Sequence, residues 1–163
     1  MDNSNLNSWK ISSAWLKDGV SLIPVRDKAD SKFPAKTPFW GWKKYQEVII
    51  SEAELFQQLE KFQTTATAMI CGKVSGNLEV IDVDTKNWEG MDVMLFEQIE
   101  KLMPKVWERL RIHKTPSGGK HILYRISDKE PEGNRKLAWK EGEKEAALET
   151  RGEGGFILSD ASM

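Results

Sequence analysis

The chain has 163 residues, of which 39% are hydrophobic and 30% are charged; this composition is typical of one globular domain and excludes a disordered chain. The single cysteine, Cys71, excludes an internal disulfide framework and a zinc site made of several cysteines. No apolar run approaches the roughly 20 residues needed to span a bilayer, so we expect no membrane partner. The single cysteine fits a reducing cytoplasm.

The formal net charge of −1 argues against a protein that coats nucleic acid nonspecifically, but the basic residues are unevenly distributed. Two groups of basic residues stand out, one within residues 28–44 and one within residues 101–125, and the latter range contains a single acid, Glu108. Such groups are compatible with a phosphate-rich ligand and also with a solvated surface. The groups are Lys28, Lys32, Lys36, Lys43 and Lys44, and then Lys101, Lys105, Arg109, Arg111, Lys114, Lys120 and Arg125.

The N-terminal third of the sequence predicts two helices, a strand and a long loop. Residues 8–17 favour a helix that ends at Gly19. Residues 20–25 favour a short strand, and residues 27–45 a loop rich in lysines and in aromatic residues, most of which we expect to pin the loop to the core. Residues 51–62 begin with a capping box and continue with apolar residues at helical spacing, which predicts a second helix.

The middle of the sequence predicts two strands followed by two helices. The apolar segment 66–71 and the segment 78–84 flank a glycine-containing turn, which favours a β-hairpin over a crossover connection. Residues 91–102 have helical periodicity and precede Pro104, and residues 106–110 favour a short further helix.

The C-terminal part predicts two more hairpins. One joins residues 111–115 to residues 121–126, and the other joins residues 146–150 to residues 156–159. The charged residues 128–145 lack a clear pattern, so we expect an exposed excursion there. Helices followed by hairpins predict an α+β fold with a largely antiparallel (mixed) sheet and flanking helices.

The most informative stretch is the strand that ends in Asp82 and Asp84. Successive side chains of a strand point to opposite faces, so the two carboxylates share one face while Ile81 and Val83 point into the core. Like charges beside an apolar strand favour a compensating cation, and Mg²⁺ or Mn²⁺ prefers such oxygen ligands. The simpler alternative is a strand that runs into a loop with two solvated aspartates.

The second of the expected hairpins carries polar residues beside its turn. Ser117, Lys120 and His121 accompany Gly118 and Gly119, where the backbone can approach a ligand and its N–H groups can cradle an anion. The spacing does not match a P-loop. A histidine at this position is also compatible with a purely structural role.

The third expected hairpin carries Glu149, an acid inside an apolar strand, and Arg151, whose planar guanidinium suits phosphate. Taken alone, Glu149 is compatible with a charge on an edge strand. If the three strands are neighbours, Asp82, Asp84 and Glu149 form a two-metal phosphoryl-transfer site.

The order of these segments resembles the three motifs of the primase-polymerase domain of the archaeo-eukaryotic primase superfamily. The resemblance extends upstream to residues 19–24, 36–46 and 71–76, so it covers nearly the whole chain and implies an archaeo-eukaryotic primase-like catalytic core. The matching segments are Ile81-Asp82-Val83-Asp84, Thr115-Pro116-Ser117-Gly118-Gly119-Lys120-His121 and Glu149-Thr150-Arg151-Gly152-Glu153-Gly154-Gly155.

The resemblance implies a role for each of nine residues. Two Mg²⁺ or Mn²⁺ ions are bound by the acids, one of which is Glu149 where the family more often has Asp. His121 contacts the triphosphate of the incoming nucleotide. The implied catalytic and metal-binding residues are Asp82, Asp84 and Glu149, and the implied nucleotide-binding residues are Ser117, Gly118, Gly119, Lys120, His121 and Arg151.

The activity that the resemblance implies is template-directed nucleotidyl transfer by a DNA primase/polymerase, in plasmid, phage or mobile-element replication. Its partners would be single-stranded or primed DNA, nucleoside triphosphates and a helicase module in the same or a partner chain. Residues 1–163 would form a single catalytic domain at the N-terminus of a longer replication protein.

Two alternatives stay open at this stage. One is a non-catalytic DNA-binding module for replication initiation on the same fold, which would use the two basic groups. The other is a different enzyme with an Asp-x-Asp motif, such as a nucleotide-sugar transferase, which the two glycine-containing hairpins disfavour.

Overall fold

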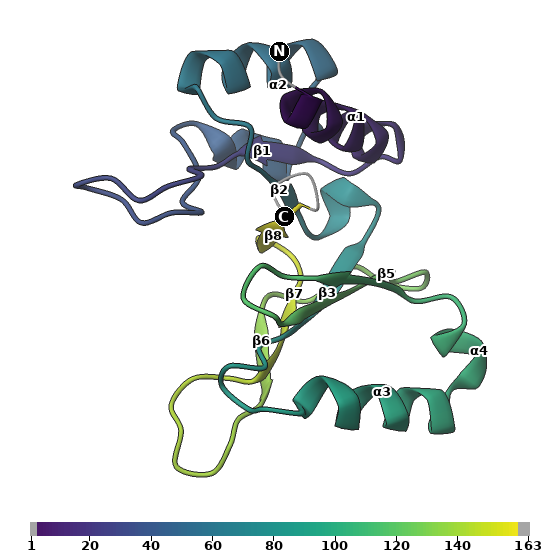
Figure 1. Ribbon diagram of the computed structural model, residues 1–163. Helices are drawn as coiled ribbons and strands as arrows, with labels where there is room; N and C mark the ends of the chain where they lie inside the picture. The colour runs from purple at the N-terminus through teal and green to yellow at the C-terminus, as the bar shows by residue number, and fades with distance from the viewer. Residues whose placement is uncertain (1–2, 160–163) are drawn as a thin grey trace.

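The computed structural model describes residues 3–159, and its strands form two separate sheets (Figure 1). Helices α1 and α2 accompany a three-stranded sheet at one end of the molecule, and helix α3 lies along a five-stranded sheet at the other end. All neighbouring strands are antiparallel. The predicted α+β class with largely antiparallel pairing is therefore confirmed.

The two N-terminal helices form where they were predicted. Helix α1 (Asn3–Lys17) includes the expected residues 8–17 and ends before Gly19, which has a positive φ of 76°. Helix α2 (Glu52–Phe62) is capped by Ser51, whose hydroxyl accepts a hydrogen bond of 3.2 Å from the backbone N–H of Glu54. Trp9 of α1 packs edge-on against Phe56 of α2, and this contact joins the two helices.

The smaller sheet has the strand order β1-β2-β8. Met69 in the central strand lies between Leu22 on one side and Ile157 on the other, and all three side chains are buried. The sheet therefore joins the start of the chain to its end. Its strands are β1 (Leu22–Pro24), β2 (Thr67–Ile70) and β8 (Phe156–Leu158).

The larger sheet has the strand order β4-β5-β3-β7-β6. Its central strand, β3, pairs with β5 on one side and with β7 on the other. Strands β4 and β5 form the predicted second hairpin. The strands are β3 (Leu78–Val83), β4 (Arg111–Lys114), β5 (Lys120–Arg125), β6 (Arg135–Ala138) and β7 (Leu148–Arg151).

The other two predicted hairpins are wrong. Strands β2 and β3 are consecutive but belong to different sheets, and so do β7 and β8. The first crossing contains the 3₁₀ helix η2 (Lys73–Ser75), flanked by Gly72 and Gly76 at positive φ, and the second contains Gly154, also at positive φ. Alternation along a strand shows which side chains are buried but not which sheet the strand joins, so the sequence pattern did not reveal these crossings.

The remaining segments confirm the prediction in part. Helix α3 (Met91–Leu102) has the expected bounds, while the short helix α4 (Pro104–Trp107) begins earlier than expected because Pro104 is favourable in the first turn. The excursion 128–145 is largely exposed but contains the unpredicted strand β6, a short edge strand with a bulge at Lys136. The 3₁₀ helix η1 (Trp42–Gln46) ends the long loop.

Strand β3 contributes to two hydrophobic cores. Leu78 and Val80 belong to the core shared with the smaller sheet, α1 and α2, whereas Ile81 and Val83 belong to a core beneath α3. Alternate residues of a strand point to opposite sides, so β3 is covered on both faces and Asp82 lies on the side of Val80. Among residues 3–159, no helix has the length and hydropathy needed to cross a membrane.

Candidate active site

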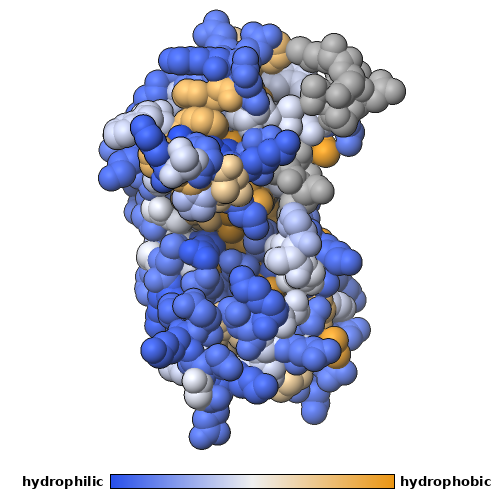
Figure 2. All heavy atoms as spheres, turned by 60° about the vertical axis from the view of Figure 1, so that its left-hand side comes forward, coloured by the Kyte–Doolittle hydropathy of each residue, from blue (hydrophilic) through white to orange (hydrophobic). Residues whose placement is uncertain are grey.

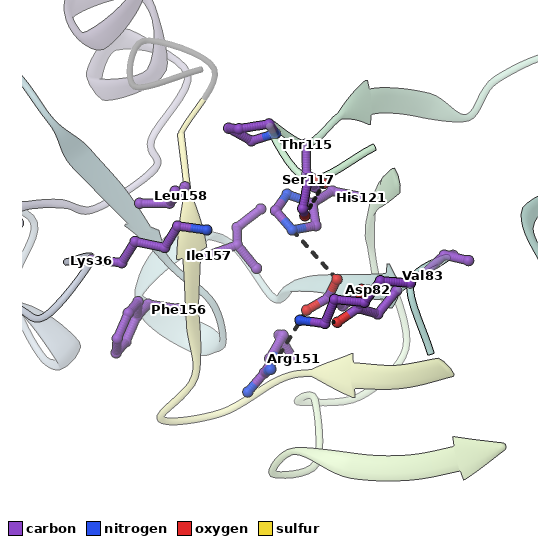
Figure 3. A pocket seen from close by; sticks show the side chains of 13 residues that line it. Lys36, Asp82, Val83, Thr115, Ser117, His121, Arg151, Phe156, Ile157 and Leu158 are labelled. Carbon is purple, nitrogen blue, oxygen red and sulfur yellow. Dashed lines mark hydrogen bonds and ion pairs between the residues drawn. The ribbon is translucent and has the colours of Figure 1, made fainter. Parts of the chain in front are cut away.

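A pocket of about 240 Å³ lies between the two sheets (Figure 3). The five-stranded sheet contributes Asp82, His121 and Arg151 to its walls, and strand β8 of the smaller sheet contributes Phe156–Leu158. The turn between β4 and β5 contributes Ser117. The pocket therefore brings together residues from all three of the motifs found in the sequence.

The strands that carry the three motifs are neighbours in the sheet, as the predicted site requires. Asp82 of β3 lies opposite His121 of β5 on one side and opposite Glu149 of β7 on the other. The three side chains thus form one row across the strands β5, β3 and β7, at the edge of the pocket. The antiparallel register of β3 with β5 and with β7 places these three residues opposite one another.

Arg151 contacts both acids of the row. It is two residues beyond Glu149 on β7, so its side chain leaves the strand on the same face. One of its Nη atoms is 3.5 Å from Oδ2 of Asp82, and the same nitrogen donates a hydrogen bond to Glu149. The guanidinium therefore compensates two carboxylates that would otherwise repel each other across the strand pair.

Asp84 follows the end of β3 and lines the same pocket. Its Oδ2 accepts a hydrogen bond from Lys86 at 2.9 Å, and Asn87 donates to it at 3.4 Å. Asn87 also donates to the carbonyl oxygen of Ala146, which fixes the loop after β3 to the segment before β7. Asp82 and Asp84 are thus both at the pocket, but each is held by a different cationic side chain.

The three acids are the type of ligand that a hard divalent cation prefers, since they offer only carboxylate oxygens. In the described part of the chain, no three histidine, cysteine or acidic side chains are grouped closely enough to hold a metal ion. Arg151 and Lys86 hold the acids instead, and both are partly exposed, at 31% and 66% of their side chains. A cation at the acids would therefore replace contacts that these two flexible side chains make.

His121 is the most buried polar residue of the pocket. Its side chain is 7% exposed, its Nε2 is 3.6 Å from Oδ1 of Asp82, and its Nδ1 has no hydrogen-bond partner among the described residues. Burial lowers the pKa of His121; Asp82 opposes this shift, and His113, Arg151 and Lys36 add to it. The lowered pKa favours the neutral form of the imidazole, and its unpartnered Nδ1 is itself buried.

The turn between β4 and β5 is shaped by its two glycines. Gly118 has a φ of 93°, and its N–H donates to the carbonyl oxygen of Thr115 within the turn, so this group is not turned toward an anion. A Cβ atom on Gly119 would lie 2.4 Å from the carbonyl oxygen of Val83. The glycines thus let the turn close tightly against β3, which brings Ser117 to the pocket.

Lys120 does not reach the pocket. It alternates with His121 along β5 and therefore points to the other face of the sheet, where its Nζ is 3.6 Å from Asp92 of α3. Of the nine residues predicted for the site, the structure places Asp82, Asp84, Ser117, His121 and Arg151 in the pocket wall. Glu149 adjoins it through Asp82 and Arg151.

Two lysines of the pocket were not predicted as site residues. Lys36 reaches in from the loop after β1, with its amino group directed toward the pocket (Figure 3), and it has a left-handed backbone with a φ of 69°. Lys86 lies two residues after Asp84. The sequence did carry a signal for Lys36, because it belongs to a basic group and stands two residues before Pro38.

Comparison with known proteins agrees with this arrangement. Residues 13–163 match the sequence profile of the family described as Bifunctional DNA primase/polymerase, N-terminal. No curated protein matches the sequence. The matched residues include both sheets and every residue of the pocket. The chain therefore belongs to the family of bifunctional DNA primase/polymerase N-terminal domains.

Proposed function

We propose that this domain performs template-directed nucleotidyl transfer in the pocket between its two sheets, with Asp82, Asp84 and Glu149 as the metal-binding acids. DNA priming and polymerisation is the activity of the family, and a polymerase of this kind uses divalent metal ions, DNA and nucleotides. The observation that supports this location most strongly is the cross-strand row of His121, Asp82 and Glu149 beside the pocket.

The acids would hold Mg²⁺ or Mn²⁺. When bound, such ions supply activation of the attacking 3′-hydroxyl group and neutralisation of the charge that develops on the leaving pyrophosphate. The chain's own residues would position the reactants and stabilise charge, which is where a protein contributes most to phosphoryl transfer.

The cationic and polar side chains of the pocket suit the triphosphate of an incoming nucleotide. Lys36 and Arg151 offer positive charge from opposite walls, and Arg151 can bond two phosphate oxygens at once. His121 lies in the wall of the same pocket with its Nε2 3.6 Å from Asp82, and the hydroxyl group of Ser117 offers a hydrogen bond to a phosphate oxygen. Lys120 takes no part, because it is paired with Asp92 on the other face.

A non-catalytic DNA-binding module on the same fold is the second candidate. One observation favours it: Arg151 pairs with Asp82 and Glu149, and Lys86 pairs with Asp84. Action in the cytoplasm during plasmid, phage or mobile-element replication, and association with a helicase module, complete the proposal on the strength of the sequence resemblance.

Calorimetric titration of dATP in the presence and absence of Mn²⁺ tests the proposal, followed by primer extension. Asp82→Asn keeps the shape of the side chain but removes its charge, and we expect it to lose metal-dependent binding and nearly all incorporation. Asp92→Asn is the matched control, because Asp92 is a partly buried carboxylate with a lysine partner outside the pocket. We expect it to behave as the wild type.

Each other outcome has a definite meaning. Full incorporation by Asp82→Asn would show that the acids of β3 are not catalytic. Salt-dependent DNA binding by a folded wild type that neither binds dATP with Mn²⁺ nor extends a primer would support the non-catalytic module.

A further inference from the structure

The loop that joins β1 to η1 is well ordered by its own contacts. The guanidinium of Arg26 lies over the rings of Phe33 and Phe39, at 4.2 and 4.5 Å from their centroids. Phe39 in turn stacks on Phe62 of α2, with 4.1 Å between the ring centroids. This column of an arginine and aromatic rings fixes the loop to the helix.

Hydrogen bonds close the base of the same loop. The N–H of Arg26 donates to Thr37 at 3.0 Å, and the N–H of Lys36 donates back to Arg26 at 2.7 Å. Within the loop, the carboxylate of Asp30 accepts hydrogen bonds from the N–H groups of Lys32 and Phe33, which lowers the pKa of Asp30. The loop is thus preorganised, and a ligand that binds it has little chain entropy to overcome.

Trp40 is the aromatic residue that this packing leaves outside. Gly41, at a φ of 79°, separates it from Trp42 and turns the chain. Trp42 packs edge-on against Phe156 of β8, whereas Trp40 is 87% exposed. Of the loop's aromatic residues, Trp42 and Tyr45 pack into the core, as predicted, Phe39 packs on α2, and Trp40 is exposed.

Trp40 borders a groove of about 700 Å³ whose walls combine aromatic rings with Arg26, Lys43 and Lys44. Residues 26–45 contain six lysines and arginines but only two aspartates, in a chain with a net charge of −1. The side of the molecule that carries the loop shows hydrophobic atoms among hydrophilic ones on its upper part (Figure 2). Aromatic rings beside positive charge are the chemistry of single-stranded nucleic acid binding.

The groove also lies close to the active-site pocket, because Lys36 of the same loop reaches into that pocket. Trp40 is four residues from Lys36, so their Cα atoms are at most about 14 Å apart. A stacked strand with a rise of about 3.4 Å per nucleotide covers this distance in about four nucleotides. A template strand that enters the pocket can therefore also contact the groove.

We infer that residues 26–44 form a binding site for the single-stranded DNA template, in which Trp40 stacks on a base and Lys43 contacts the phosphate backbone. The inference rests on the proposed function, since it concerns the template of that reaction. The positive charge of the groove favours a nucleic acid over a protein partner, and a duplex would not offer an unstacked base to Trp40.

Fluorescence anisotropy with a fluorescein-labelled single-stranded oligo(dT) of about 20 nucleotides, at fixed salt, tests the site. We expect Trp40→Ala to weaken binding about tenfold, and Trp40→Phe, which keeps a ring, to weaken it much less. Trp139→Ala is the matched control, because Trp139 is also exposed, at 55%, but lies in the larger sheet's excursion; its affinity should equal that of the wild type. Lys43→Ala should reduce the slope of log affinity against log salt by about 1.

The same variants separate this inference from the proposed function. Trp40→Ala should still bind dATP with Mn²⁺ as the wild type does, since Trp40 lies outside the pocket. If Trp40→Ala binds oligo(dT) as tightly as the wild type does, the proposed template site is wrong. If Arg109→Ala, in the other basic group, then lowers the affinity, DNA binds at that group instead. A third outcome is possible: the wild type extends no primer, but Trp40→Ala binds oligo(dT) more weakly than the wild type does. The polymerase proposal then fails and the single-stranded DNA site stands.

Discussion

Asp82 and Glu149 lie directly opposite each other on β3 and β7, and the guanidinium of Arg151 contacts both carboxylates. Like charges that face each other across a strand pair are destabilising, so the arginine stabilises the sheet as long as no cation is bound there. A divalent ion at the two acids would perform the same compensation. Metal binding would thus exchange one positive partner for another.

Arg151→Ala should therefore make the protein's stability depend on metal. Without Mn²⁺ we expect its melting temperature to fall by about 2–4 °C, the shift for about 1 kcal/mol in a domain of this size. With Mn²⁺ the melting temperature should rise more in the variant than in the wild type. Thermal melts with and without Mn²⁺ measure both effects.

Arg125→Ala is the control for this experiment, because Arg125 pairs with Asp18 away from the pocket. Its melting temperature should respond to Mn²⁺ as that of the wild type does. An equal response in all three proteins would show that Asp82 and Glu149 do not share a cation.

Lys36→Ala should raise the KM for the incoming nucleotide by about tenfold and change kcat less, because a charge-assisted hydrogen bond to phosphate is lost from ground and transition state alike. Steady-state primer extension over a range of dNTP concentrations measures this. Lys105 is exposed and lines neither the pocket nor the groove, so Lys105→Ala should leave KM unchanged. A normal KM in Lys36→Ala would remove this lysine from the nucleotide site.

Gly119→Ala should destabilise the fold by about 1–3 kcal/mol, because its Cβ would lie 2.4 Å from the carbonyl oxygen of Val83 and would push the turn away from β3. Chemical denaturation at equilibrium measures the loss. Gly133→Ala is the matched control, since the closest atom to its Cβ would be 3.9 Å away. Equal stability of the two variants would show that the turn has room to move.

Cys71 should be unreactive in the native protein. It is 1% exposed, and burial raises the pKa of its thiol to about 12, so the reactive thiolate is scarce at pH 8. A colourimetric thiol reagent at pH 8 should label the protein only after denaturant is added. The pKa of the thiol is higher in the folded protein than in the unfolded chain. The free energy of unfolding should therefore decrease as the pH rises above about 8.5, because the unfolded chain then loses this proton first. Rapid labelling without denaturant would show that the thiol is accessible.

The sequence predicted the helices and the second hairpin because their signals are local. The Ser51 cap and the periodicity of residues 91–102 depend on neighbours within a few positions. The crossings after β2 and β7 were missed, because the choice between two sheets depends on contacts with segments that are distant in sequence. The edge strand β6 was missed for the same reason, since its pairing with β7 makes up for a polar, exposed sequence.

The candidate site was predictable where the residue type was unusual for its place. Acids within an apolar strand pointed to Asp82 and Glu149, and the sheet brings them together. Lys120 looked equivalent to its neighbour His121, but the alternation of β5 sends the two side chains to opposite faces. The sequence marked Lys36 only as one member of a basic group, because only the folded loop brings it to the pocket.

The pairing of β8 with β2 has a consequence for how the chain folds during synthesis. Ala68 lies opposite Leu158, so the smaller sheet cannot be completed until almost all of the domain has been made, and contacts that are so distant in sequence form slowly. Until β8 pairs with it, β2 has an unpaired edge exposed to solvent, although all four of its residues are buried in the complete fold. We expect a nascent chain that stalls before residue 156 to aggregate or to need a chaperone, although its larger sheet already has all five strands.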